Sequence, residues 1–275
     1  VPIQRAELER LSPGTLAFME LRSPRDREIL LKMYEGRHLL GSSGPGTWNA
    51  RLHRELHMTD DRGLWTDEGG VLYGPRRVLG KVAGIKDETP FYEPKDWPEI
   101  RKRMAEKGFW PLYEGKHIEQ FLIDLKPIER WVNLDSHQKE YGRQPDASPK
   151  LVFRRIASNT NERTGMAVVL PARSCFGDSI TRLHIDEVDL NSIATIFNSF
   201  VFDWAIRFRA VGNNLSGTYI SRIPTIPALE RAILQTKSAD CGLMGHFAED
   251  RNLWPIAWRS NRVVAETYGL DPDDF

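Results

Sequence analysis

Residues 190–208, LNSIATIFNSFVFDWAIRF, carry the clearest helical pattern in the chain. Their apolar side chains recur every three to four positions over about five turns, which is the spacing of one helical face. The stripe consists of Leu190, Ile193, Phe197, Phe200, Val201, Trp204 and Phe208. A stripe this wide and apolar is typical of a buried helix. We therefore predict one long core helix over these residues.

The segment before this helix is rich in strand signals instead. Residues 150–156, KLVFRRI, mix four apolar residues with three cations, as a half-exposed strand does. Strands are predicted at residues 110–113, 117–123, 150–157, 166–170 and 180–185. After the helix, GNNLSG (212–217) predicts a loop, and residues 218–223 predict a further strand. The whole pattern predicts an α+β fold with a mixed β core and a long packed helix.

Shorter helices are predicted on both sides of this core. Ser23 is a good N-cap and Gly36 a natural stop, so a helix is expected between them. A second is expected over residues 96–108, and helical structure resumes from residue 228. The chain is thus predicted to divide into a helical and irregular N-terminal segment (1–108), an α+β core (109–227) and a C-terminal helical segment (228–275).

Composition places the chain among ordinary globular proteins. Hydrophobic residues make up 40% and charged residues 28% of its 275 residues, which argues against wholesale disorder and against a membrane bundle. The longest apolar stretches, such as residues 166–170, are far shorter than the roughly 18 residues that cross a bilayer. Cys175 and Cys241 are too few for a disulfide framework, which favours a reducing compartment. We expect a cytoplasmic protein without a membrane partner, and the start at Val1 suggests a piece of a longer chain.

Charge is balanced overall but segregated along the sequence. Lys plus Arg and Asp plus Glu both number 38. Residues 150–182 nevertheless hold six cations against two acids, whereas residues 263–275 hold four acids and no Lys or Arg. Amides and hydroxyls cluster near the cations, a mixture that can neutralise phosphates and read base edges. A solvated strand face with polar turns would have the same composition, so both interpretations stay open here.

Enzyme motifs are weak. The chain has no Pro-Pro, so it lacks the Asn/Asp-Pro-Pro-aromatic tetrapeptide of an adenine methyltransferase. HRELH (53–57) places two histidines at i, i+4, but the glutamate is not where a metalloprotease needs it. Glu114 and Lys116 could form half of a metal-dependent nuclease site, with Asp96 or Glu99 as a further ligand. We expect no catalytic residue and no metal site in this chain, and we keep the nuclease as an alternative.

Four phrases in order carry a family resemblance: WPLYEGK (110–116), RRIASNTNERT (154–164), NSFVFDW (198–204) and NRVVAETYGLDPDDF (261–275). Together they resemble the TaqI-like C-terminal target-recognition (specificity) domain of adenine-specific DNA methyltransferases and type IIG restriction-modification enzymes, which serve in phage defence. The resemblance implies a mixed β core of target-recognition type that holds double-stranded DNA. It also implies an N-terminal methyltransferase domain in the same polypeptide, which binds S-adenosylmethionine and flips the adenine, so this chain itself holds no cofactor.

A set of DNA-binding residues follows from the charge pattern and the resemblance together. We expect phosphate contacts from cations, and base reading from loop amides and a hydroxyl. The predicted phosphate contacts are Lys116, Arg154, Arg155, Arg163 and Arg173. The predicted base-reading residues are Asn159, Asn161, Asn213, Asn214 and Ser216. A further alternative is that the region mainly docks the catalytic domain, with Trp254 and Trp258 at the interface.

Overall fold

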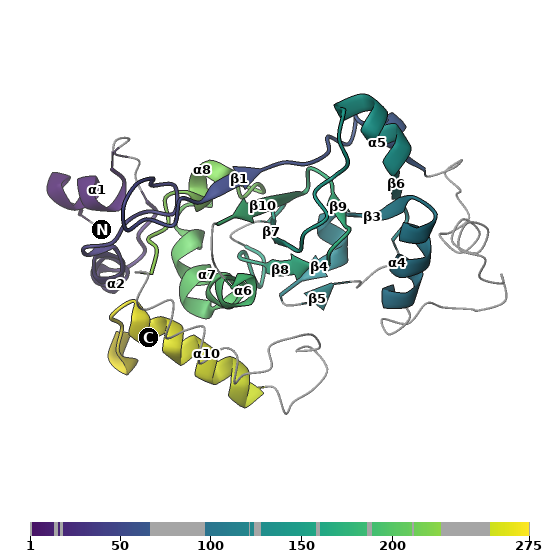
Figure 1. Ribbon diagram of the computed structural model, residues 1–275. Coiled ribbons are helices and arrows are strands. Elements are labelled where there is room, and N and C mark those ends of the chain that lie inside the picture. Colours follow the sequence, from purple (N-terminus) through teal and green to yellow (C-terminus); the bar gives the residue numbers. More distant parts are fainter. Residues whose placement is uncertain are drawn as a thin grey trace.

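A four-stranded antiparallel sheet lies at the centre of the fold (Figure 1). The computed structural model describes residues 2–13, 16, 19–66, 97–120, 122–123, 128–157, 160–185, 189–210, 212–226 and 254–274. The sheet has the order β1-β10-β7-β8. Its strands are β1 (Arg51–His53), β10 (Ile180–His184), β7 (Lys150–Arg154) and β8 (Ala167–Leu170).

A second sheet stands beside the first and is mixed. Its order is β2-β6-β3-β9, and β3 pairs with β9 in parallel while the other pairs are antiparallel. Its strands are β2 (Trp65–Thr66), β6 (Trp131–Asn133), β3 (Phe109–Tyr113) and β9 (Cys175–Phe176). A small hairpin joins β4 (Ile118–Glu119) to β5 (Leu122–Ile123). The predicted α+β class with a mixed β core is therefore confirmed.

The two faces of the central sheet pack against different layers, because strand side chains alternate. Leu151 and Phe153 of β7 point into one core cluster with α6 and α7, while Val152 points into another with β3 and α4. Helix α4 spans Trp97–Glu106, close to its predicted range. Helix α5 (Leu134–Tyr141) follows β6 and was not predicted. Val168 and Leu170 of β8 and Ile180 of β10 join the cluster of Val152, so this second layer also reaches the Ile180 end of β10.

The predicted long helix is wrong in one respect: it is two helices. Helix α6 (Leu190–Asn198) ends before Ser199, and α7 (Phe200–Arg207) begins after it. Ser199 has extended backbone (ψ 152°), and its hydroxyl caps α7 by accepting the Phe202 N–H. The amide of Asn198 meanwhile pairs with the Ala167 backbone of β8 in both directions, at 2.9 and 2.8 Å. Capping and this backbone pairing override the apolar period.

The strand predicted at 218–223 is also wrong. Residues Gly217–Ile220 form the short helix α8 instead. The carbonyl of Ser216 accepts hydrogen bonds from the Tyr219 and Ile220 N–H groups, as a helix start requires. This helix follows the 212–217 loop directly and fixes its position beside β1, because Gly217 lies against the side chain of Leu52.

The chain ends are joined by ion pairs. Helix α2 (Pro24–Tyr34) begins at the predicted Ser23 cap, which forms a capping box with Asp26. Its Lys32 contacts the buried Asp274 carboxylate at 2.9 Å, so the acidic C-terminal segment is neutralised by an N-terminal helix. Helix α1 (Arg5–Leu11) packs on α2, and α10 (Trp254–Thr267) packs on α6 and α7.

Residues from all three predicted segments share one core cluster, which includes Leu30, Ile193 and Val264. The boundaries after residues 108 and 227 stay predictions. Among the described helices, none is long and apolar enough to cross a bilayer.

Candidate nucleic-acid interface

The tripeptide Arg-Leu-His occurs twice, and its two copies pair with each other. Residues 51–53 form β1 and residues 182–184 end β10, in an antiparallel register that sets Arg51 opposite His184 and His53 opposite Arg182. The central leucines, Leu52 and Leu183, face each other and pack in the core. The two arginines and two histidines therefore share the outer face of the sheet, related by a local twofold arrangement.

These four side chains line a cleft of about 400 Å³. The opposite wall comes from α5 and the loop that follows it, which contribute His137, Arg143 and Asp146, among others. In all, four arginines and three histidines line the cleft against two carboxylates. Positive charge therefore gathers in this cleft, although the chain as a whole has no net charge.

Both carboxylates of the cleft are held by cations. Asp146 accepts from Arg182 at 2.6 Å and from the Ser148 N–H at 2.9 Å. Burial alone would raise the pKa of Asp146, but the hydrogen bonds from Ser148 and Arg182 outweigh it and hold that pKa well below its usual range. Glu55 lies 3.5 Å from the ammonium of the fully buried Lys150. Arg51, Arg54 and Arg143 line the same cleft, so its arginines outnumber its carboxylates.

The environment of the cleft lowers the pKa of the His53 imidazole. Its ring centroid lies 6.2 Å from that of His184, with the planes at 80°. Partial burial lowers the pKa of His53, and the neighbouring His184, Arg182 and Arg51 lower it further. His53 is consequently neutral at neutral pH, and an anion in the cleft would favour its protonation.

Three of the predicted phosphate contacts gather at one end of β7. Lys116 lies on the turn η3 (Gly115–His117), where the Gly115 N–H donates to the Ser179 hydroxyl. Arg155 donates its N–H to the Ser179 carbonyl, and the Arg154 side chain lies against Gly115. Two of these cations already have acidic partners within the protein. Lys116 binds Glu129 at 2.6 Å, and the Arg155 side chain is only 14% exposed, 3.9 Å from Asp178.

Arg54 connects this group to the cleft. It lines the cleft directly after β1 and lies close enough to Arg155 to lower the pKa of that guanidinium, to which burial contributes most. The cationic surface therefore continues from the Arg-Leu-His strands to the end of β7.

The predicted base-reading loop borders the same end. Asn214 bridges to Ile156, and the next residue, Leu215, donates its N–H to the Arg155 carbonyl at 2.7 Å. Asn213 and Asn214 are exposed and Ser216 is half-buried. The loop thus offers amide side chains beside the cationic surface.

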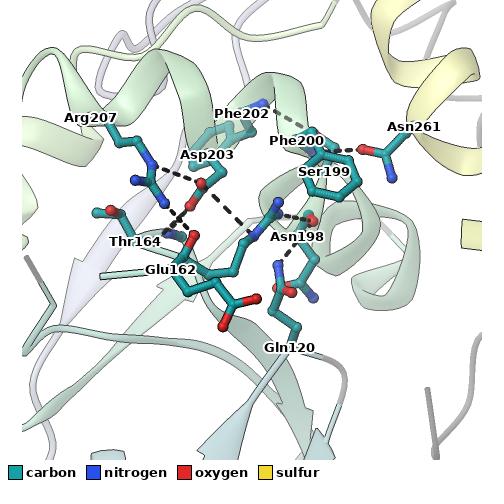
Figure 2. A network of polar contacts seen from close by, with 12 residues as sticks. Gln120, Glu162, Thr164, Asn198, Ser199, Phe200, Phe202, Asp203, Arg207 and Asn261 are labelled. Carbon is teal, nitrogen blue, oxygen red and sulfur yellow. Dashed lines mark hydrogen bonds and ion pairs between the residues drawn. The ribbon is translucent and has the colours of Figure 1, made fainter. Parts of the chain in front are cut away.

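Arg163 is placed differently from its prediction. Figure 2 shows the network at the junction of α6 and α7 that it joins. Its guanidinium donates to the Asn198 carbonyl at 2.6 Å, lies 3.8 Å from Asp203 and stacks on the Phe200 ring at 4.4 Å. The side chain is 13% exposed, and burial lowers the pKa of the guanidinium. Arg163 is therefore a structural residue that is not placed to neutralise a backbone phosphate.

The remaining predicted residues are spread out. Arg173 is exposed, and its N–H donates to the Ala147 carbonyl, next to Asp146 at the far end of the cleft from Arg155. Asn161 is half-buried on the loop before Arg163, and Asn159 lies outside the described residues.

The sequence prediction missed most of the cleft. It counted Arg182 in the positive segment, but not Arg51, Arg54, Arg143 or His184. A signal was present in the repeated Arg-Leu-His tripeptide, since two identical alternating strands can pair with their polar side chains on one face.

The nuclease alternative gains no geometric support. Glu114 is bound by Arg130 at 2.6 Å and lies 3.5 Å from Lys116. Glu99 pairs with Arg103 on α4, and Asp96 lies outside the described residues. Within the described part of the chain, no three His, Cys, Asp or Glu side chains gather as metal ligands would.

The sequence matches no model of a known protein family, and no curated protein matches it significantly.

Proposed function

We propose that this chain is the DNA sequence-recognition module of an adenine-specific DNA methyltransferase or a type IIG restriction-modification enzyme. One observation carries the proposal: the cationic cleft built on the paired Arg-Leu-His strands continues to the amide-bearing 212–217 loop. Phosphate contacts fix the register of a protein on a duplex, and base contacts specify the sequence. In this proposal the cleft supplies cations for phosphate contacts, and the loop supplies amides for base contacts.

The dimensions of this surface suit a short stretch of duplex. Its strand β10 pairs with β7, whose residues 150–155 span roughly 17 Å at about 3.3 Å per residue. Duplex DNA rises about 3.4 Å per base pair, so the surface spans about five pairs. We assign phosphate contacts to Arg51, Arg54, Arg143 and Arg182, and base contacts to Asn213 and Asn214.

In this proposal the chain reads DNA and performs no chemistry. A methyltransferase domain elsewhere in the same polypeptide binds S-adenosylmethionine and receives the flipped adenine, and the chain itself holds no cofactor. We place the whole protein in the cytoplasm, where its DNA substrate lies.

The test is duplex binding measured by fluorescence anisotropy over a range of salt concentrations. Each phosphate that these arginines neutralise contributes about −0.9 to the slope of log affinity against log salt, so binding should weaken steeply as salt rises. Arg54→Ala removes one phosphate contact and is expected to flatten the slope by about 0.9. Arg5→Ala is the matched control, since Arg5 is an exposed arginine on α1 that pairs with Glu9 and does not line the cleft. A flat salt response, or an equal effect of both substitutions, would contradict the proposal.

A second candidate function, docking of the catalytic domain, is favoured by exposed aromatic residues. Trp258 on α10 is 72% exposed and Phe200 is 52% exposed. They lie near each other, because Asn261, one turn after Trp258, accepts the Phe200 N–H at 2.6 Å. The side chain of Trp254 lies outside the described residues. Trp258→Ser should leave DNA affinity of this chain unchanged but lower methylation by the full polypeptide if this surface docks the catalytic domain.

A further inference from the structure

We propose that the paired Arg-Leu-His strands form a binding site for a single phosphate group, held by Arg51, His53, Arg182 and His184. This inference rests on the proposed function only in using the same cleft. It does not require duplex DNA to be the ligand. The shared chemistry is a tetrahedral oxyanion, supplied either by the backbone of a duplex or by a free phosphate compound.

The geometry of the four side chains supports one shared ligand. Arg51 is opposite His184 and His53 is opposite Arg182, so each arginine has an imidazole as its cross-strand neighbour. The two imidazole centroids are 6.2 Å apart. Hydrogen bonds to an oxyanion are about 2.7–2.9 Å long, so donors on two sides of one phosphate stand roughly 5 to 8 Å apart. Imidazoles whose ring centroids are 6.2 Å apart are close enough for one ring nitrogen of each to reach the same phosphate.

Donor number favours phosphate over a carboxylate. Two guanidinium groups and two imidazoles offer more N–H donors than the two oxygens of a carboxylate can accept, whereas phosphate has more oxygens and more charge. Arg182 is already oriented in the cleft, since Asp146 holds its guanidinium at 2.6 Å. A pre-oriented arginine loses less freedom when the ligand binds.

The charge state of His53 gives the site a specific signature. The charged and titratable groups that line the cleft with His53 are His184, Arg182, Arg51, Arg54, Glu55, His137, Tyr141, Arg143 and Asp146. Partial burial and the neighbouring His184, Arg182 and Arg51 lower the pKa of His53 in the free protein, whereas a bound anion stabilises its protonated form. Protonation of His53 therefore accompanies binding, and affinity rises as pH falls, by at most about tenfold per pH unit for this one proton.

The experiment follows the histidine side chains by NMR during titration with inorganic phosphate at pH 7. Saturable shifts are expected for His53 and His184, while the exposed His38 and His57 report only the ionic strength, which sodium chloride matches in a parallel titration. A second titration uses sulfate between pH 6 and 8, because sulfate remains a dianion throughout. Its affinity should increase toward pH 6. Arg51→Gln should weaken phosphate binding at least tenfold, and Arg5→Gln should leave it unchanged.

Competition with duplex DNA separates the two sources and the two proposals. Phosphate that displaces duplex identifies a backbone phosphate as the ligand. If phosphate binds as expected while duplex does not bind, the site stands with a free phosphate compound as its ligand, and the proposed function fails. If duplex binds but phosphate shifts neither imidazole beyond the sodium chloride control, the phosphate site is overturned while the proposed function stands.

Discussion

His53 and His184 face each other diagonally across β1 and β10, with their ring centroids 6.2 Å apart and an arginine beside each on the opposite strand. Such a group of like-charged side chains is unfavourable when all are protonated, and it persists because Leu52 and Leu183 anchor the same two strands in the core. We therefore expect that the cationic side chains which favour anion binding at this site also lower the free energy of unfolding.

The free energy of unfolding should fall at acid pH because of His53. Its pKa in the folded protein lies below the ordinary value of 6.5. As pH drops below 6.5, the unfolded chain binds a proton that the folded chain resists, so the folded state loses stability in this window. His53→Gln should reduce the difference in urea midpoint between pH 7.5 and pH 5.5. The same decline in His53→Gln and wild type would show that this imidazole is not responsible, and His38→Gln is the matched control.

Asn214 should govern sequence preference more than affinity. Its amide is exposed on the loop beside Arg155, where a bidentate contact to an adenine is worth about 1–3 kcal/mol of discrimination. Asn214→Ala is expected to relax one base position in a selection from random duplexes while the salt slope stays constant. A change in slope with an unaltered preferred sequence would instead make Asn214 a backbone contact. The control is Asn49→Ala, outside the proposed surface.

Asn198 should be among the most sensitive positions for folding. Its buried amide satisfies both the N–H and the carbonyl of Ala167, where β8 begins. Asn198→Ala leaves two buried backbone groups without partners and should lower the free energy of unfolding by about 2–4 kcal/mol. Asn198→Asp should also be strongly destabilising, because a carboxylate cannot donate to the Ala167 carbonyl. Denaturant unfolding measures both, and an exposed amide, Asn213→Ala, should change stability little.

The features that were predictable from sequence are those with local causes. The helix after Ser23 depends on a capping box within four residues, and the β7 strand depends on its own run of apolar residues, although residues 150–153 are buried on both faces and not half-exposed as expected. The break at Ser199 was not predictable from apolar spacing, because it is coupled to the pairing of Asn198 with a strand more distant in sequence. An apolar stripe reports which face is buried and does not report whether the helix is continuous.

The candidate site was predictable only in part for the same reason. A count of charge within residues 150–182 included Arg155 and Arg182, but the cleft also needs Arg51 and Arg143 from separate segments. The same count included Arg163, whose partner Asp203 lies outside that window. A count of charges along the sequence therefore overestimates the positive charge of a surface where ion pairs form between distant segments. It underestimates that charge where strands bring distant cations together.

Asp203 should hold the junction of α6 and α7 together. Its carboxylate accepts from the Thr164 and Gly165 N–H groups at 2.7 and 2.6 Å and from Arg207 at 2.9 Å (Figure 2). Asp203→Asn removes the charge that Arg163 and Arg207 face, and it should cost about 3–5 kcal/mol of stability. Thermal unfolding should show a large loss for Asp203→Asn and a negligible one for Asp60→Asn, whose carboxylate is 79% exposed. Equal effects would mean that the network contributes little.

The buried ion pair of Lys150 with Glu55, a residue that lines the cleft, can be tested through its effect on the free energy of unfolding. Lys150 is fully buried and donates to the Asp146 and Ser174 carbonyls, and Glu55 accepts the Phe176 N–H at 2.9 Å. Lys150→Met leaves Glu55 buried without its cation, which should cost about 3–5 kcal/mol.

Restoring neutrality should recover part of that loss. Burial already raises the pKa of Glu55, and removing Lys150 raises it further, so the folded variant keeps a proton that the unfolded chain releases above about pH 4.5. Lys150→Met should therefore lose stability progressively between pH 5 and pH 8. The double variant Lys150→Met with Glu55→Gln keeps an acceptor for the Phe176 N–H, removes the charge and should be nearly independent of pH in that window. Urea unfolding at pH 5 and pH 8 decides between them, and a single variant that is insensitive to pH would mean that solvent reaches Glu55 and screens its charge.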